Sequence, residues 1–180
     1  PTTALVTDMD RPLADAAGNA VEVAYAVDYL TGARREPRMH EVVLALASEM
    51  LLLGKLVRTP QTARTKLQAA LDSGAAAEKF GHMVAALGGP KKFVDNPWQH
   101  MAAAPITASI HPERAGTVRR IDTRAVGMVV VAASGGGCVS VGLERESSER
   151  GAAWKRESWV DVDSEEEGER VKATMIMLLL

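Results

Sequence analysis

The sequence predicts an α/β fold, in which helices of a large α/β domain are followed by the start of a smaller β-rich C-terminal domain. Apolar residues recur at helical spacing from residue 20 to residue 87, whereas short apolar runs separated by turn residues begin at Pro105. The chain has 180 residues, of which 47% are hydrophobic and 24% charged, so it is able to bury a core.

The first three expected elements are a strand and two helices. Residues 2–6 are apolar and β-leaning, and turn-forming residues follow them, which predicts a short buried strand. A helix is expected from Ala20 to Leu30, with Gly32 just beyond its end. Residues 39–56 carry a wide apolar stripe, which predicts a largely buried helix at the centre of the core. The stripe consists of Val42, Val43, Leu46, Ala47, Met50, Leu51 and Leu53.

Two further helices are expected before residue 88. Thr59 and Pro60 predict the start of one, because threonine is a favoured N-cap and proline is favoured at the first helical position. Ser73 and Gly74 are expected to end it. The other helix is predicted over residues 75–87, before a glycine-proline stop.

These elements predict four parts of the chain. Residues 1–88 are assigned to the large α/β domain and residues 89–104 to a connector. Residues 105–137 hold short β-type runs, including Met128–Val131, and are predicted to be an incomplete β-rich C-terminal domain. Acidic residues outnumber basic residues over 138–180, which are predicted to form a divergent, largely disordered tail.

The composition argues against several classes of protein. A net charge of −2 does not favour nucleic-acid binding. The apolar runs are shorter than the roughly 20 residues that a membrane-spanning helix needs. Cys138 is the only cysteine, so no intrachain disulfide can form, which suits a cytoplasmic location. We therefore expect neither a nucleic-acid partner nor a membrane partner.

Side chains that could bind a metal or exchange protons are scattered along the sequence. Asp8 and Asp10 precede a proline, where acidic residues usually serve turns rather than acid–base chemistry. The Gly135–Gly137 run could cradle a phosphate, but no helix is expected after it, so a turn is favoured. The histidines, which lack the spacing of metal ligands, are His40, His82, His100 and His111.

Several motifs follow one another in a fixed order up to Gly137. They are Thr3-Ala4-Leu5-Val6-Thr7-Asp8-Met9, Ala17-Gly18-Asn19-Ala20-Val21-Glu22-Val23, Glu49-Met50-Leu51, Ala70-Leu71-Asp72-Ser73-Gly74, Phe80-Gly81-His82-Met83-Val84 and Asp122-Thr123-Arg124-Ala125-Val126-Gly127-Met128. This series resembles the interior-to-C-terminal portion of the thymidine phosphorylase, or pyrimidine-nucleoside phosphorylase, family. The chain opens without methionine inside an expected strand, which also leads us to expect a piece of a longer polypeptide.

The resemblance implies a homodimeric pentosyltransferase of pyrimidine nucleoside salvage, which converts thymidine and phosphate to thymine and 2-deoxyribose 1-phosphate. In the family, a loop with lysine, histidine, glycine and serine holds the phosphate, and an arginine, a serine and a lysine hold the pyrimidine. These groups lie on segments N-terminal to the matched stretch. The sequence has no such loop and no Ser-Gly-Arg signature, so no catalytic residue is assigned and the chain alone is expected to be inactive.

The resemblance also implies one metal site. Some relatives bind a monovalent cation through backbone oxygens at the positions matching Leu13 and Ala16, and through a glutamate at the position matching Tyr25. Carbonyl oxygens suit such a hard cation, and a carboxylate compensates its charge. Tyr25 cannot supply that charge. Leu13 and Ala16 are thus the candidate metal ligands, and no other cofactor is expected.

Two functions follow from these observations. The first is that the chain is a portion of a thymidine phosphorylase and supports its second domain. The alternative is a non-enzymatic fragment or pseudo-enzyme that keeps only packing or interaction surfaces.

Overall fold

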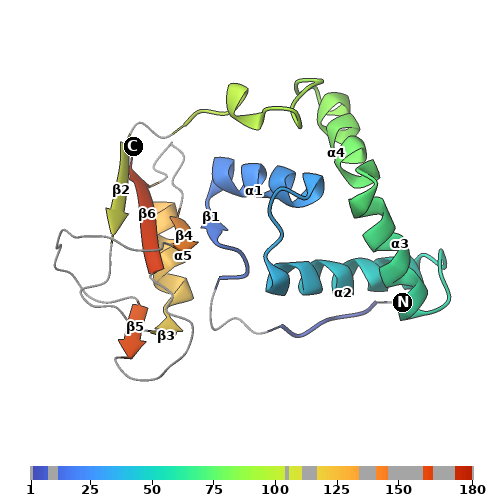
Figure 1. Cartoon of the computed structure of the whole chain (residues 1–180), viewed down its shortest axis with the longest axis horizontal. Helices are drawn as coiled ribbons and strands as arrows, with labels where there is room; N and C mark the ends of the chain where they lie inside the picture. Colours follow the sequence, from blue (N-terminus) through green and yellow to red (C-terminus); the bar gives the residue numbers. More distant parts are fainter. Residues whose placement is uncertain are drawn as a thin grey trace. The chain divides into compact units, whose positions relative to one another are not determined.

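The computed structural model describes residues 2–7, 12–103, 106–110, 117–133, 141–145, 160–163 and 173–179. The chain divides into two compact units. The first unit contains Pro1–Thr7 and Val23–Met101, and the second contains Asp8–Glu22 and Ala102–Leu180. The first unit is helical, so the described part of the stretch predicted to belong to the large α/β domain is mainly a set of helices (Figure 1).

Four helices and one short 3-10 helix build the first unit. Helix α2 packs against α3, and α3 packs against α4. All four helices lie where the apolar spacing predicts helices. They are α1 (Asn19–Thr31), most of which belongs to this unit, α2 (Pro37–Leu53), α3 (Pro60–Asp72), α4 (Ala75–Ala86) and the 3-10 helix η1 (Pro97–Gln99).

Side-chain caps explain where α2 and α3 begin. The carboxylate of Glu36 accepts the backbone N–H of Met39 at 2.7 Å, which starts α2 two residues before the predicted boundary. The hydroxyl of Thr59 accepts the N–H of Thr62 at 3.2 Å, and Pro60 occupies the first turn of α3. The predicted start of α3 is therefore confirmed.

The core of the first unit is formed mainly by small and aromatic side chains. The ring of Phe93, which follows α4, lies 6.4 Å from the ring of Phe80 and 6.1 Å from that of His100. These ring contacts fasten the segment after α4 onto the helix. The buried apolar residues of this unit are Ala24, Tyr25, Val27, Tyr29, Leu44, Ala63, Leu71, Ala77 and Phe93.

The prediction that α2 is largely buried is wrong in this structure. Leu44 and Ser48 are buried, but Leu46 is 47% exposed and Met50 is 71% exposed. An apolar stripe predicts burial only where another element covers it. In this structure the described residues cover one side of α2 and leave Leu46 and Met50 on the other side exposed.

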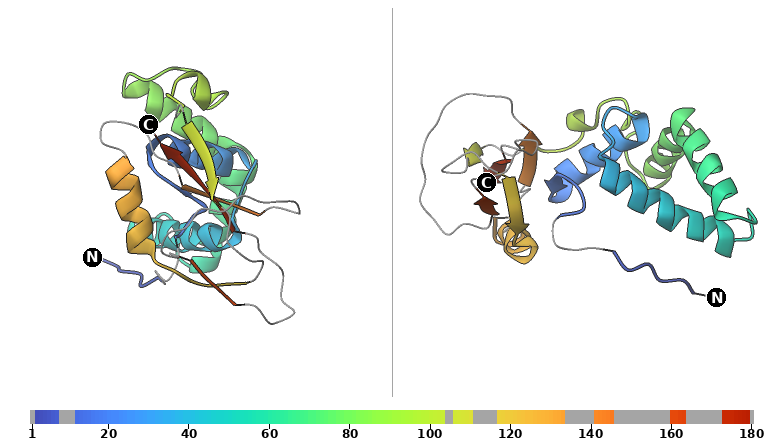
Figure 2. Two further views of the ribbon diagram at one scale, coloured as in Figure 1. Left: turned by 90° about the vertical axis from the view of Figure 1, so that its left-hand side faces the viewer. Right: turned by 60° about the horizontal axis from the view of Figure 1, so that its bottom comes forward.

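The predicted buried strand at residues 2–6 is also wrong. Residues 2–7 form an extended segment without strand pairing (Figure 2), in which Leu5 is 41% exposed and Val6 is fully exposed. A strand is buried only when neighbouring strands and a covering layer surround it. No described strand pairs with residues 2–7.

The second unit contains two small antiparallel sheets and one helix. The larger sheet has the strand order β1-β4-β6-β2, and the smaller pairs β3 with β5. The helix α5 follows β3 directly. The bounds are β1 (Ala16–Ala17), β2 (Ile106–Ile110), β3 (Thr117–Ile121), α5 (Thr123–Ala133), β4 (Val141–Arg145), β5 (Val160–Asp163) and β6 (Ala173–Leu179).

Helix α5 corrects the β-type reading of Met128–Val131. The carboxylate of Asp122 accepts the N–H of Ala125 at 2.9 Å, and the carbonyl of Asp122 accepts that of Val126 at 3.0 Å. Aspartate is a strong N-cap, so this local signal overrides the β preference of the valines that follow.

Three strands of the second unit, β4, β5 and β6, lie within residues 138–180, where the sequence predicts little order. β2 pairs along its whole length with β6, from Ile106 opposite Leu179 to Ile110 opposite Met175. The boundary at residue 137 falls outside the described residues, and the four predicted parts of the chain stay predictions.

Candidate functional site

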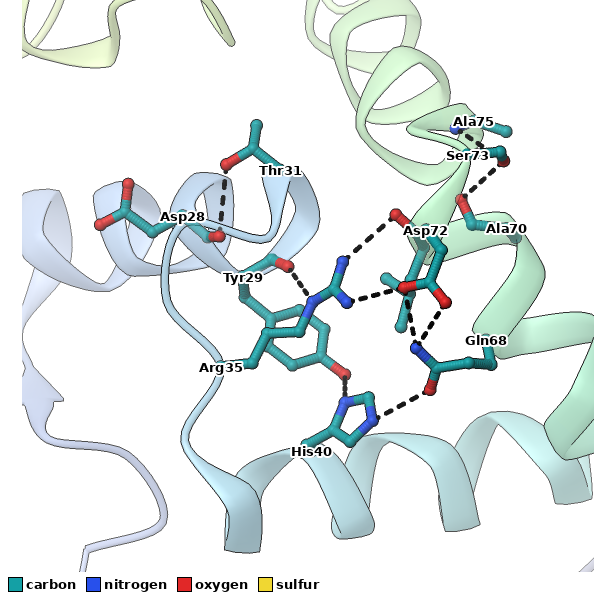
Figure 3. Close-up of polar contacts among 11 residues, drawn as sticks. Asp28, Tyr29, Thr31, Arg35, His40, Gln68, Ala70, Asp72, Ser73 and Ala75 are labelled. Carbon is teal, nitrogen blue, oxygen red and sulfur yellow. Dashed lines mark hydrogen bonds and ion pairs between the residues drawn. The ribbon is translucent and has the colours of Figure 1, made fainter.

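A network of polar side chains connects α1, α2 and α3 in the first unit (Figure 3). Arg35 lies in the loop between α1 and α2, where Gly32, with φ +84°, lets the chain turn after the helix. Tyr29 comes from the last turns of α1 and His40 from the first turn of α2. Gln68 and Asp72 lie one turn apart on α3. Hydrogen bonds connect these five side chains into one cluster.

Each side chain in this network donates to the next, from Tyr29 through His40 and Gln68 to Asp72. A carboxylate only accepts, so Nε2 of Gln68 donates to the two Asp72 oxygens at 2.9 and 3.0 Å. Oε1 of Gln68 therefore faces Nε2 of His40 at 3.2 Å, and that nitrogen carries the proton. Nδ1 of His40 then accepts the hydroxyl proton of Tyr29 at 2.8 Å.

Arg35 closes the network on its other side. Its Nη1 donates to Asp72 at 3.0 Å, and its Nη2 donates to the carbonyl of Leu71 at 3.2 Å. Its Nε donates to the carbonyl of Tyr29 at 3.0 Å, and its guanidinium lies 5.9 Å from the centre of the Tyr29 ring. One arginine thus holds the ends of α1 and α3 together.

Two pKa shifts follow from these contacts. The hydrogen bond from Gln68, aided by that from Arg35, lowers the pKa of the Asp72 carboxyl below its ordinary value. Tyr29 is only 4% exposed, and this burial raises the pKa of its hydroxyl, against a smaller opposing effect of Arg35. At neutral pH the network therefore contains an ionised carboxylate and a protonated phenol.

A second ion pair joins the same two helices. The Arg64 guanidinium on α3 donates to the Glu41 carboxylate on α2 at 2.6 and 2.8 Å, and this hydrogen bond lowers the pKa of Glu41. Both side chains are exposed, so salt will screen the pair.

The arrangement can brace helices, but the described residues show no reacting centre. Both ring nitrogens of His40 are engaged, and the hydrogen-bonding groups of Arg35, Gln68 and Asp72 serve one another. Within the described ranges, no cluster of three or more histidine, cysteine, aspartate or glutamate residues could hold a metal ion. No described helix is long and apolar enough to cross a membrane.

The predicted cation ligands fall in different units. Leu13, which is 39% exposed, and Ala16 belong to the second unit, whereas Tyr25 belongs to the first. Tyr25 is 4% exposed, its hydroxyl accepts the N–H of Glu36 at 3.3 Å, and the guanidinium of Arg34 lies 5.5 Å from its ring centre. Tyr25 therefore serves packing here, and the cation site at Leu13 and Ala16 stays a prediction.

The histidines that the structure describes lie in different places. His40 belongs to the network, and His100 packs on Phe93, whereas His82 is an exposed residue of α4. Outside the described residues lie Asp8, Asp10, His111, Gly135–Gly137 and Cys138. The sequence did not single out Arg35, Gln68 and Asp72, because the contacts His40–Gln68 and Arg35–Asp72 join residues 28 and 37 positions apart and give no local signal.

Comparison with known proteins identifies relatives of this chain. The family model for the glycosyl transferase family, a/b domain, matches residues 1–77. The thymidine phosphorylase of Burkholderia cenocepacia strain HI2424 is 53% identical over 135 residues, which are 75% of this chain and 31% of that protein. The thymidine phosphorylase of Burkholderia orbicola strain AU 1054 has the same identity and coverage, and that of Burkholderia lata is 51% identical over 135 residues. The chain thus spans about a third of the length of these relatives.

Proposed function

We propose, from the premise that this chain belongs to the thymidine phosphorylase family as a segment of its longer members, that it is the helical part of a pyrimidine nucleoside phosphorylase. The whole enzyme would cleave thymidine with phosphate to thymine and 2-deoxyribose 1-phosphate, as a cytoplasmic homodimer. Thymidine and phosphate would be bound by other segments of it. The observation that carries the proposal is the 53% identity over 135 residues.

The role of this segment in such an enzyme is structural support. The Arg35 network and the Glu41–Arg64 ion pair hold α1, α2 and α3 as one body, in which the polar groups are engaged with one another. A rigid body of this kind supports a site that other segments carry, because catalytic groups must be held within a fraction of an ångström. The strands β2 and β3, which lie within residues 105–137, would belong to the smaller β-rich domain of the family.

A chimeric enzyme tests the proposal. The 135 matched residues of the Burkholderia cenocepacia relative are replaced by those of this chain, and phosphate-dependent release of thymine is measured. We expect the chimera to keep phosphorolysis within about tenfold of the relative, because the exchanged residues only support the site. A folded chimera without activity would contradict the proposal and favour the pseudo-enzyme alternative.

The isolated chain provides the second arm. It should release no thymine above a heat-treated control, because the sequence has neither the phosphate loop nor the pyrimidine contacts that the family uses. Phosphate-dependent release by the isolated chain would show that residues of this segment perform the chemistry.

A further inference from the structure

Helix α2 has apolar residues on two opposite sides. At 100° per residue, Leu46, Met50 and Leu53 project within about 60° of one another, roughly opposite to the buried residues Leu44 and Ser48. The surrounding sector of the helix holds only apolar residues. We call this sector the outer face of α2; it consists of Met39, Val42, Val43, Leu46, Met50 and Leu53.

The opposite side of α2 is already covered. His40 bonds to Gln68 of α3 and Glu41 bonds to Arg64 of α3. Both residues project on the same side of α2 as Leu44, so this side faces α3. The outer face points away from α3. Three of its residues are exposed, Leu46 by 47%, Met50 by 71% and Leu53 by 38%, and Met39, Val42 and Val43 are half-buried.

A helix that is apolar on both sides is normally covered on both. The matched family domain is an a/b domain, in which helices bury one face against a central sheet. The described part of the first unit provides helices and an extended, unpaired segment at residues 2–7, but no sheet. The Burkholderia relatives are about three times as long as the segment that matches this chain.

We propose that the outer face of α2 is a docking surface for the apolar face of a β-sheet, formed by the part of the phosphorylase chain that lies outside the matched segment. The sheet supplies branched apolar side chains, and the outer face contributes three flexible methionine or leucine anchors without a charged residue among them. This inference uses the family membership and does not depend on catalytic activity.

Cysteine labelling tests the docking surface. Met50→Cys on the outer face and Ala69→Cys on an exposed position of α3 are made in this chain and in the full-length chimera. The rate of maleimide labelling is followed by mass spectrometry of the peptides that contain each position. In the isolated chain, both cysteines should react rapidly. In the chimera, the labelling rate of Met50→Cys should fall by about tenfold or more, while Ala69→Cys keeps its rate.

Three other results would overturn the proposal. Equal labelling of Met50→Cys in the chain and in the chimera would show that nothing docks there. Protection that grows with the concentration of the isolated chain would assign the face to a second copy. Slow labelling in the dilute isolated chain would show that the chain covers the face itself. If the chimera is insoluble, a cysteine at the aligned position of the Burkholderia relative gives the same comparison.

A charge substitution gives a second readout. Met50→Glu should leave the unfolding midpoint of the isolated chain unchanged and should lower that of the chimera or of the relative, whereas Ala69→Glu should change neither. Equal effects of the two substitutions would contradict docking.

The failure of the docking surface and that of the proposed function can be told apart. A chimera that is protected at Met50 but inactive would contradict the proposed function and support the docking surface. An active chimera that is labelled freely at Met50 would contradict the docking surface and support the proposed function.

Discussion

The guanidinium of Arg35 lies 3.0 Å from the carboxylate of Asp72 and joins the loop before α2 to the last residue of α3. The same side chain reaches the carbonyls of Tyr29 and Leu71 at 3.0 and 3.2 Å. Both carbonyls lie near helix C-termini and accept long backbone hydrogen bonds, from Gly32 at 3.3 Å and from Gly74 at 3.4 Å, so a planar fork of additional donors is well suited to this position.

Replacing Arg35 should therefore destabilise the first unit. Arg35→Met removes a donor from two partly buried carbonyls, and we expect a loss of about 1–3 kcal/mol in urea unfolding followed by circular dichroism. Arg35→Lys keeps the charge but should restore only part of the loss, since an ammonium cannot reach all three acceptors. Arg58→Met, at an exposed position, is the control, and an equal loss there would contradict the role of the fork.

Tyr29 should make the stability of the chain fall in alkali. Burial raises the pKa of its hydroxyl above the ordinary value of about 10. The unfolded state therefore loses this proton first, so the stabilisation is present below about pH 10 and is lost as the pH rises through the raised pKa. In unfolding curves between about pH 9 and pH 11, Tyr29→Phe should show a shallower loss than the parent chain. Parallel losses would exclude Tyr29 as a source.

Ser48 offers a stabilising substitution. Its hydroxyl is buried on α2 and has no hydrogen-bond partner among the described residues. Ser48→Ala removes that group and raises helix propensity, so the unfolding free energy should rise by about 1 kcal/mol. A loss of stability on thermal unfolding would reveal a partner for the hydroxyl.

Gly89 has no room for a side chain. A Cβ at this position would lie 2.6 Å from Cγ1 of Val84 and 3.0 Å from its carbonyl oxygen, which already accepts the Gly89 N–H at 2.9 Å. Gly89→Ala should cost about 1–3 kcal/mol of unfolding free energy, because the end of α4 must shift. Gly127→Ala on α5, where a Cβ meets open space, should instead be neutral or stabilising. The reverse order of the two would refute the packing argument.

Limited proteolysis tests the tail. Trypsin should cut first at Arg150, Lys155 or Arg156, in the charged stretch whose composition predicts little order, and only later at Arg64 or Lys66 on α3. Equal protection of both groups would show that residues 138–180 pack, as the pairing of β4 and β6 suggests for the strands among them.

Local signals predicted the helices well. Thr59 and Pro60 specify the start of α3 through their own backbone and side-chain chemistry, so a single sequence suffices to place it. Gly32 does the same for the end of α1 through its positive φ. The missed helix α5 had a comparable signal in Asp122, which the β preference of Met128–Val131 obscured.

Nonlocal features were not predictable in the same way. The stripe of α2 shows which residues are apolar, but it does not tell which side of the helix α3 covers. Met50 lies on the side away from α3 and is exposed. The contact of Arg35 with Asp72 joins residues 37 positions apart, and composition and periodicity contain no information on such a pair. The candidate network could therefore be found only in the folded chain.

The position of the partners of Arg35 has a consequence for synthesis on the ribosome. A nascent chain grows from its N-terminus, so α1 and the Arg35 loop leave the exit tunnel before Leu71 and Asp72 leave it. Until then, the loop lacks the acceptors on α3, and α1 and α2 can still change their mutual angle. A ribosome stalled after α1 and α2 have left the tunnel, but before Leu71 and Asp72 have done so, should thus present a helical pair that proteases cut readily, and emergence of those two residues should protect it.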